Sequence, residues 1–394
     1  MKASKEVMKK TNEKLLLKEI YFNKGIDRAT LAKKSNLSPA TVTNLVGEMV
    51  EKNLVKETGM ANSTGGRKPI SLEVNPSFKK VLALKIGLGY LDFLLTDLNG
   101  TILQHSKIYY ENKMSPNLVI GELEKIWNLW NLNSTELLGI GVAVSGVIDS
   151  KNGIIKNSFL LKWENIKLAK ILNDKFSVYI FISNDVDSFA LAQLWKGEAW
   201  KYPNSMFLTL GVGIGGAIIL NGKLHSSNGG VGEFGHMTVK LDGRKCNCGS
   251  KGCLEAEASF EVLAEKVFEK TDSVKLKSLY ESLNTTESSE MEFLQEAITH
   301  DKKTLTEVFN EYSKIIGIAL KNIINIFAPD YLLLGGEALQ FKEYFFNTSI
   351  NYAKENAFIG LADNLVFDED KLGDKAWTYG CIYQIIVNEL LTVK

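Results

Sequence analysis

The sequence predicts an α/β protein in two parts, with a winged helix-turn-helix at the N-terminus and a larger body of two similar lobes. Residues 1–75 combine three helix signals with two short strand patterns, and Asn75-Pro76 marks the start of a body at residues 76–394. Both halves of the body open with an apolar strand, glycines, a second apolar strand and an Asn-Gly turn. The 394 residues, 45% of them hydrophobic, are enough for two or three globular domains.

The N-terminal part is basic although the whole chain is neutral. The chain has 46 Lys and Arg against 46 Asp and Glu, whereas residues 1–70 hold 14 against 7, which leaves +7 there and −7 in the remainder. A basic segment on an acidic body suggests that the segment meets a polyanion. The alternative is a basic helix that is simply solvated.

The N-terminal helices are expected over residues 5–23, 28–34 and 39–53, because apolar residues recur there at helical spacing. Ser38 is a good N-cap for the third helix, and Pro39 suits its first position because no backbone donor is needed there. Two helices, a tight turn and a third helix form a helix-turn-helix.

The third helix is expected to present small polar side chains to the major groove of DNA. Asn44 can bond adenine through two atoms, and a Thr can contact the methyl group of thymine. The alternative is a three-helix module that binds another protein. The expected DNA-contacting residues of this segment are Ser38, Ala40, Thr41, Thr43 and Asn44.

A wing is expected after the third helix, with strands over residues 54–57 and 69–74. Between them, two glycines precede Arg67 and Lys68, a composition that fits a wing tip or arm that enters a minor groove beside phosphates. A plain flexible linker is the alternative.

The body alternates strands and helices. The expected strands lie at residues 81–87, 90–97, 101–109, 138–144, 178–182, 205–210, 216–220 and 331–334, with helices near 117–131 and through most of 261–325. The repeated opening of the two halves suggests a duplicated fold with a cleft between its lobes.

The sequence contains no expected membrane span or secretory signal. The longest apolar run, residues 207–220, has 14 residues, fewer than the roughly 18 that a spanning helix needs. The N-terminus is rich in lysine and has no long apolar core. We therefore expect a cytoplasmic protein.

Three of the four cysteines cluster with a histidine in a pattern typical of metal binding. His236, Cys246, Cys248 and Cys253 supply one nitrogen and three sulfurs, a complete tetrahedral set for a structural Zn²⁺. Four protein ligands leave no position for a catalytic water. Three reduced, buried cysteines are the alternative.

With the run at residues 12–17, the Gly65–Pro69 segment and the body pattern, the chain resembles the ROK family of sugar kinases and sugar-responsive repressors over almost its full length. It is most similar to the xylose-repressor branch. The resemblance implies an actin-like, ribonuclease H-like fold of two lobes and assigns the histidine–cysteine motif to zinc.

The same resemblance implies a sugar site of planar polar groups, which clasp neighbouring hydroxyls well. His236 would use one ring nitrogen for zinc and the other for a sugar hydroxyl. In ROK kinases the residue that matches Asp185 is the general base, but an acceptor there also serves a sensor. The residues that match the sugar contacts are Asn184, Asp185, Glu233, His236 and Glu255.

The phosphate loops depart from the kinase pattern. Lys85 replaces an acidic residue of the first loop, Gly89 replaces its Thr, and Val212 stands where the second loop of kinases has a Thr. Glu337 places an acidic residue where the nucleotide would approach. We therefore expect no enzyme activity.

These observations predict a repressor that binds an inverted-repeat operator as a homodimer or higher homo-oligomer and responds to a monosaccharide. Xylose is the first candidate, while glucose and N-acetylglucosamine would suit the same polar groups. The alternatives are a ROK-type sugar kinase that carries a helix-turn-helix, and a scaffold whose body docks a transporter component.

Overall fold

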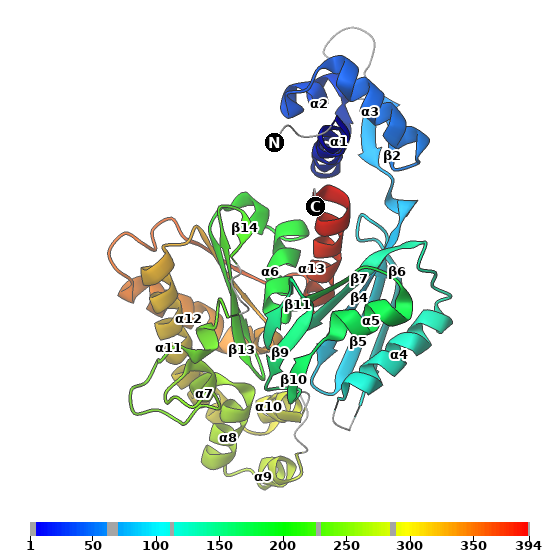
Figure 1. Ribbon diagram of the computed structural model, residues 1–394. Coiled ribbons are helices and arrows are strands. Elements are labelled where there is room, and N and C mark those ends of the chain that lie inside the picture. The colour runs from blue at the N-terminus through cyan, green and yellow to red at the C-terminus, as the bar shows by residue number, and fades with distance from the viewer. Residues whose placement is uncertain (1–4, 61–69, 111–113, 226–229, 284–288, 393–394) are drawn as a thin grey trace.

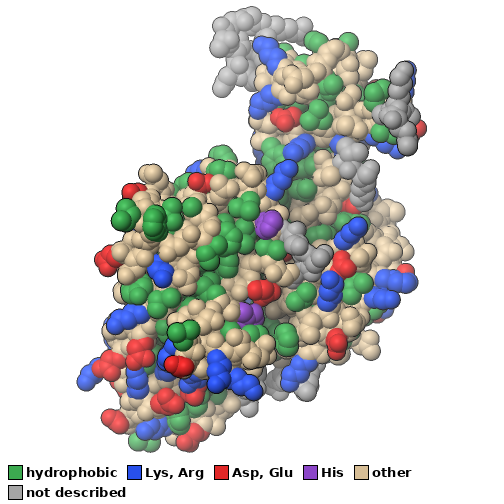
Figure 2. Space-filling model, turned by 60° about the vertical axis from the view of Figure 1, so that its left-hand side comes forward, with side chains coloured by type: hydrophobic (Ala, Val, Ile, Leu, Met, Phe, Trp, Pro, Cys, Tyr) green, Lys and Arg blue, Asp and Glu red, His purple; other side chains and the backbone are tan. Residues whose placement is uncertain are grey.

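The computed structural model describes residues 5–60, 70–110, 114–225, 230–283 and 289–392. A small N-terminal head stands on a larger body, and Figure 1 shows the C-terminal helix reaching up to the base of the head. Figure 2 shows the head as a separate knob on the surface of the molecule. Within the described residues, no helix is long and apolar enough to cross a membrane.

The head is a helix-turn-helix with a small sheet. Its helices are α1 (Lys5–Phe22), α2 (Arg28–Ser35) and α3 (Pro39–Glu51), and its strands are β1 (Ile26–Asp27), β2 (Val55–Met60) and β3 (Ile70–Val74), in the order β1-β3-β2. The three expected helices are confirmed, although α3 ends two residues before the expected Asn53. The tip of the predicted wing, with Arg67 and Lys68, lies outside the described residues.

Local sequence signals fix the helix ends of the head. Asp27 Oδ1 accepts hydrogen bonds from the backbone of Ala29 and Thr30, at 2.8 and 2.9 Å, so it caps α2. Ser38 Oγ accepts from Thr41 N at 3.2 Å and caps α3. The apolar side chains of α3 at Val42, Leu45, Val46 and Met49 are buried, which leaves its opposite face to solvent.

The first lobe of the body is built on a five-stranded sheet in the order β11-β7-β4-β5-β6, with β4–β5–β6 antiparallel and β4, β7 and β11 parallel. A small sheet, β10-β9-β8, adds to this lobe. The elements are β4 (Lys80–Gly87), β5 (Tyr90–Thr96), β6 (Ile102–Tyr109), α4 (Pro116–Leu129), β7 (Leu137–Val144), β8 (Val147–Asp149), β9 (Ile154–Ser158), β10 (Trp163–Ile166), α5 (Leu168–Phe176) and β11 (Ile180–Asn184).

The second lobe repeats this topology. Its sheet has the order β14-β13-β12-β15-β16, and β12 takes the place of β4 with one antiparallel and one parallel neighbour. The predicted duplication is confirmed by this matching strand order. The strands are β12 (Ser205–Leu210), β13 (Ile214–Leu220), β14 (Lys223–Leu224), β15 (Tyr331–Gly335) and β16 (Val366–Glu369).

Helices surround and join the two sheets (Figure 1). The second lobe carries a helical cluster, and its apolar residues form one large core with β12 and β15. The last element of the described residues is a π-helical turn, Val387–Leu391. The further helices are α6 (Asp185–Trp195), α7 (Leu254–Ala258), α8 (Phe260–Lys270), α9 (Val274–Glu281), α10 (Ser289–His300), α11 (Lys302–Phe327), α12 (Lys342–Asn356) and α13 (Lys375–Ile386), and the 3₁₀ turns are Pro76–Phe78, Ala199–Lys201, Phe234–His236 and Glu337–Phe341.

The helix pair α6–α13 lies between the two sheets. In β4, Leu82, Leu84 and Ile86 face the core on the α4 side, whereas Val81 and Ala83 pack with Ile382 and Ile385 of α13. On the other side, Phe189 of α6 packs with Phe207 and Leu333 of the second sheet. Strand alternation therefore directs one face of each sheet toward the same pair of helices.

The head joins the body through α1 and the C-terminal turn. Lys14 Nζ donates to the carbonyls of Glu389 and Leu390, at 2.6 and 2.8 Å. Leu16 and Leu17 of α1 share an apolar cluster with Leu390 and with α13. Tyr21 Oη donates to the carbonyl of Leu98 at 2.8 Å, which anchors the head to the first lobe as well.

Candidate functional site

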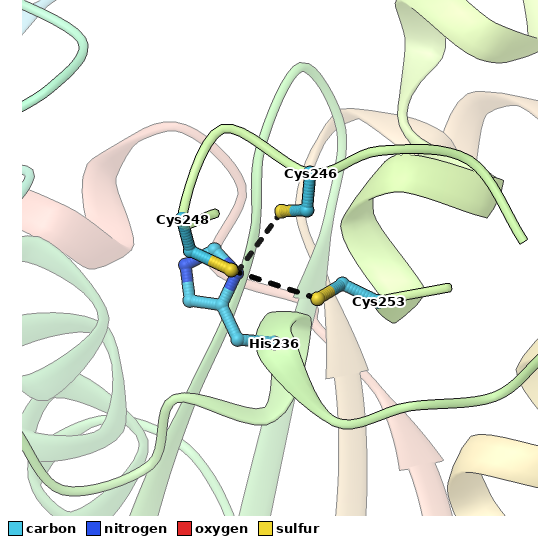
Figure 3. A group of neighbouring side chains, drawn as sticks. All are labelled: His236, Cys246, Cys248 and Cys253. Carbon is cyan, nitrogen blue, oxygen red and sulfur yellow. Dashed lines mark hydrogen bonds between the residues drawn. The ribbon is translucent and has the colours of Figure 1, made fainter. Parts of the chain in front are cut away.

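The histidine–cysteine motif forms a compact cluster in the second lobe. His236 ends a short 3₁₀ turn, Cys246 and Cys248 lie on the following loop, and Cys253 precedes α7. One ligand atom from each of the four residues lies within 4.8 Å of the others. Figure 3 shows the four side chains pointing toward one another.

The distances in this cluster fit a tetrahedral metal. Sγ of Cys246 lies 3.6 Å from Nδ1 of His236, and the sulfurs of Cys248 and Cys253 are 3.7 Å apart. A tetrahedron with metal–sulfur bonds of about 2.3 Å has edges of about 3.8 Å. The donor set and its spacing therefore fit a four-coordinate metal site.

Glycine makes the loop around this cluster possible. Gly252 has φ +65°, and a Cβ there would lie 1.6 Å from the carbonyl oxygen of Lys240. The loop can therefore close against Lys240 only because residue 252 has no side chain.

The same histidine borders a group of carboxylates. Nε2 of His236 lies 3.9 Å from Oε2 of Glu233, on the side of the ring away from the sulfurs. The pKa of Glu233 is raised by burial and by the nearby Glu255 and Asp185, while His236 lowers it. The 3₁₀ turn at His236, α7 and α6 therefore bring four of the predicted residues close together, namely His236, Glu233, Glu255 and Asp185.

Asn184 and Asp185 lie where β11 passes into α6. Asn184 Oδ1 accepts from the backbone of Val186 at 2.8 Å and caps the helix, and its Nδ2 donates to the carbonyl of Gly146 at 2.9 Å. These bonds fix the Asn184 side chain beside Asp185, at the edge of the first sheet.

Asp185 forms a buried ion pair with Lys85 of β4, a contact that the sequence did not predict. Lys85 is only 5% exposed, and its Nζ also lies 4.9 Å from the centre of the Trp377 ring of α13. Its position follows from strand alternation, because Lys85 shares the α13-facing side of β4 with Val81 and Ala83.

Glu255 links the metal segment to the second glycine loop. Its Oε2 accepts a hydrogen bond from the backbone of Ile214 at 3.0 Å, and it lies on α7, two residues after Cys253. An ordered metal segment would therefore also fix the position of Glu255.

Asp187 is an additional acidic residue that the sequence analysis missed. Burial, together with the nearby Asp185 and Glu233, raises its pKa to about 7. In the sequence, the one indication of a role for Asp187 was its position two residues after Asp185. The site thus brings several partly buried carboxyl groups close together.

The two glycine loops are occupied by side chains of the protein itself. A Cβ at Gly211 would lie 1.9 Å from Oε2 of Glu337, so that carboxylate rests on the second loop. Burial raises the pKa of Glu337, and Lys85 acts in the opposite direction. In the first loop, the ring of Tyr90 packs on Gly87 in the same way.

The predicted DNA-contacting face is largely exposed. The side chains of Ala40, Thr43 and Asn44 are exposed, and that of Thr41 is half-buried. Ser38 is exposed too, but its Oγ lies 2.8 Å from the Thr41 hydroxyl, so both hydroxyls are partly engaged at the helix start. The face lies beside a groove lined by Arg28, Ala29, Ala32, Lys33, Leu37, Pro39 and Thr43.

Comparison with known proteins identifies the family. The family model described as "ROK family" matches residues 81–386. The chain belongs to the ROK family. The family resemblance inferred from the sequence is therefore confirmed, and the match covers most of the body.

Relatives extend this similarity through the head. The xylose repressor of Caldicellulosiruptor bescii is 30% identical over 389 residues, which cover 98% of this chain and 97% of the relative. The xylose repressor of Bacillus subtilis is 29% identical and covers 99% and 98%. The transcriptional dual regulator NagC of Escherichia coli is 26% identical and covers 84% and 82%.

Solved structures agree with the fold. A ROK family transcriptional regulator, a homologue of the Escherichia coli MLC protein, has a TM-score of 0.82 at 24% identity and covers 98% of both chains. A ROK family glucokinase from Streptomyces griseus, solved with glucose and AMPPNP, has a TM-score of 0.65 at 21% identity and covers 77% of this chain. The predicted α/β fold with its N-terminal head is confirmed.

Proposed function

We propose that this chain is a sugar-responsive transcriptional repressor of the cytoplasm, with xylose as the first candidate effector. Residues 1–75 form the DNA-binding domain and residues 76–394 the sugar-sensing domain. The support is that xylose repressors match nearly the whole chain, including the head. The boundary agrees with β3, which ends at Val74.

One observation favours a sensor over a kinase. The groups that would meet the phosphates and the metal of a nucleotide are engaged within the protein, because Lys85 pairs with Asp185 and the Glu337 carboxylate rests on Gly211. A carboxylate on the glycine loop repels a triphosphate. With Gly89 and Val212 in place of hydroxyl-bearing residues, the chain binds sugar without transferring phosphate.

The head binds operator DNA through α3. Its exposed polar face, Ala40 to Asn44, reads bases in a major groove, while Arg67 and Lys68 contact phosphates or a minor groove. Two heads in a homodimer then read an inverted repeat. The exposed helix face and the basic charge of residues 1–70 support this assignment.

The metal is a structural Zn²⁺ held by His236, Cys246, Cys248 and Cys253. When bound, it supplies no chemistry beyond fixing the fold of the segment, because all four positions are taken by protein ligands. The segment in turn positions Glu255 and Glu233. The sulfur and nitrogen distances of the cluster support this identity.

The sugar binds between the lobes, where Asn184, Asp185, Glu233, His236 and Glu255 present acceptors and amide donors to hydroxyl groups. Near the middle of the face in Figure 2, an acidic side chain lies beside a histidine. Closing the lobes on the sugar moves the helix pair between them, and with it the head.

A sugar screen and a DNA titration test this function. Thermal unfolding with D-xylose, D-glucose and N-acetyl-D-glucosamine should show a raised melting temperature for one of them, because only the folded state binds. Fluorescence anisotropy with operator DNA should then show that this sugar changes DNA affinity, and DNA should change sugar affinity by the same factor.

Variants complete the test. Glu233→Ala should blunt the sugar response and leave DNA affinity intact, whereas Glu261→Ala, on the exposed face of α8, serves as the matched control. A fragment of residues 76–394 should lose operator binding. The proposal would be contradicted if the protein phosphorylated the sugar in the presence of Mg-ATP. It would also be contradicted if the Glu233→Ala protein responded to the sugar as the wild type does.

A further inference from the structure

Lys85 is a buried cation inside the sugar-binding lobe, and its environment explains why it is tolerated. A lysine is almost never buried unless a partner compensates its charge. Here Asp185 provides that charge and the Trp377 ring provides a cation–π contact at 4.9 Å. Both neighbours of Lys85 along β4, Leu84 and Ile86, are fully buried in the apolar core.

The pair also determines how Asp185 presents its oxygens. Oδ2 is bonded to Lys85, and Oδ1 lies 3.0 Å from Val186 N, whose N–H it shares with Asn184 Oδ1. Each carboxylate oxygen has two acceptor positions, so Oδ1 keeps one for a further donor. A carboxylate that is held at both oxygens has one orientation, which is what recognition of a specific hydroxyl requires.

Lys85 balances an otherwise negative site. Asp185 and Asp187 both lie in the first turn of α6, and the Glu337 carboxylate rests on Gly211 of the second glycine loop. The Asp185 carboxylate is largely buried, and the Lys85 charge offsets the cost of burying it. Lys85 is part of the chain and supplies its charge without any ligand. A metal–nucleotide complex would have to bind before it could supply a positive charge at this place.

We propose that Lys85 is a positioning residue of the sugar site, which holds the Asp185 carboxylate ready for a sugar hydroxyl and makes sugar binding independent of any nucleotide. This inference rests on the sugar-sensing function proposed above. It predicts that loss of the Lys85 charge weakens sugar binding through Asp185 and through no other group.

Isothermal titration calorimetry with zinc-loaded, full-length protein tests the proposal, using whichever of D-xylose, D-glucose and N-acetyl-D-glucosamine binds the wild type most tightly. Lys85→Met should weaken binding about tenfold or more, since it removes a charged hydrogen bond. Lys85→Arg, which keeps the charge, should retain more affinity than Lys85→Met. Mg-AMPPNP should leave the wild-type affinity unchanged.

The matched control is Lys80→Met, on the same strand, where the lysine pairs with Glu136 at the surface. It should bind the sugar as the wild type does. A double-mutant cycle with Asp185→Asn separates positioning from general stability. In the Asp185→Asn background, Lys85→Met should cause no further loss of sugar affinity. The double variant leaves neither Lys85 nor Asp185 as an unpaired buried charge, so it can be measured even if Lys85→Met alone fails to fold.

Three results would overturn the proposal. Tighter sugar binding by Lys85→Met would mean that Lys85 competes with the sugar for Asp185. A further loss in the double variant would mean that Lys85 acts elsewhere. If none of the three sugars bound the wild type, the sugar-sensing function itself would fail, and this inference with it.

Discussion

The contact between α6 and α13 is so close that a single methyl group should disturb it. Gly380 of α13 lies against the backbone of α6, where a Cβ would be 1.7 Å from the carbonyl oxygen of Ser188 and 2.4 Å from its carbon. Ordinary contacts of a Cβ begin at 3.4 Å, so Gly380→Ala requires the two helices to separate by about 1.7 Å, the difference between these values.

The magnitude follows from two opposing effects. Overpacking of this kind costs about 1–3 kcal/mol and sometimes more, and here the obstructing atoms are backbone, which cannot rotate away. Alanine recovers up to about 1 kcal/mol over glycine in a helix. We expect a net loss of about 2 kcal/mol in the free energy of unfolding, and a melting temperature lower by about 2–3 °C for a chain of this length.

Differential scanning calorimetry of the protein, purified with Zn²⁺ in the buffer, measures this effect. The control is Gly121→Ala on α4, where a Cβ meets nothing within 4 Å. That change should stabilise the protein by about 0.5–1 kcal/mol, because alanine is the better helix former. An unchanged or raised melting temperature for Gly380→Ala would refute the close helix contact.

Three other predictions concern the metal, the acidic site and the head. Cys248→Ser should lose its zinc, measured by metal analysis of the purified protein, and should unfold at a lower temperature; full zinc content would contradict the assigned ligands. The raised pKa of Asp187, about 7, keeps its carboxyl protonated in the fold at pH values where the unfolded chain has ionised it. The native state therefore binds more protons between roughly pH 4 and 7, so stability from this group falls as pH rises through that window, by up to about 1.4 kcal/mol per unit. Asp187→Asn should flatten the dependence of the urea-unfolding free energy on pH between about pH 5 and pH 7, and an unchanged slope would exclude this group as the cause. Asn44→Ala should reduce discrimination between operator variants by about 1–3 kcal/mol at one base pair, measured by anisotropy at fixed salt, whereas a uniform loss on all DNA would point to a phosphate contact.

The head could be predicted from sequence because its signals are local. Asp27 and Ser38 each cap the helix that follows, and both caps appear in the structure. Strand boundaries were less exact, since β2 continues to Met60 beyond the expected Glu57. The metal cluster could also be predicted from the sequence, because its ligands lie within 18 residues and their chemistry is distinctive.

The ion pair between Lys85 and Asp185 could not be predicted in the same way. Lys85 and Asp185 are 100 residues apart, and only the parallel pairing of β4, β7 and β11 brings their strand ends together. The sequence indicated that Lys85 disrupts a phosphate loop, but not that it has a partner. Likewise, Glu337 reaches Gly211 only because β15 lies next to β12. Contacts of this kind depend on sheet order, which local patterns do not specify.

The position of α6 shows how a sugar site could act on the head. Its first turn carries Asn184 and Asp185, and its last residue, Trp195, stacks on Tyr383 of α13 with ring centres 5.8 Å apart. Tyr383 in turn lies edge-on to Phe22 at the end of α1, at 6.5 Å. Because α6 is a single rigid helix of 11 residues, a tilt at its Asp185 end also moves its other end. The same helix contacts both lobes, so lobe closure and head orientation share one mechanical element. If this element carries the response, loosening the aromatic contact with Tyr383→Ala should leave both sugar and DNA affinity in place and reduce the factor by which each changes the other.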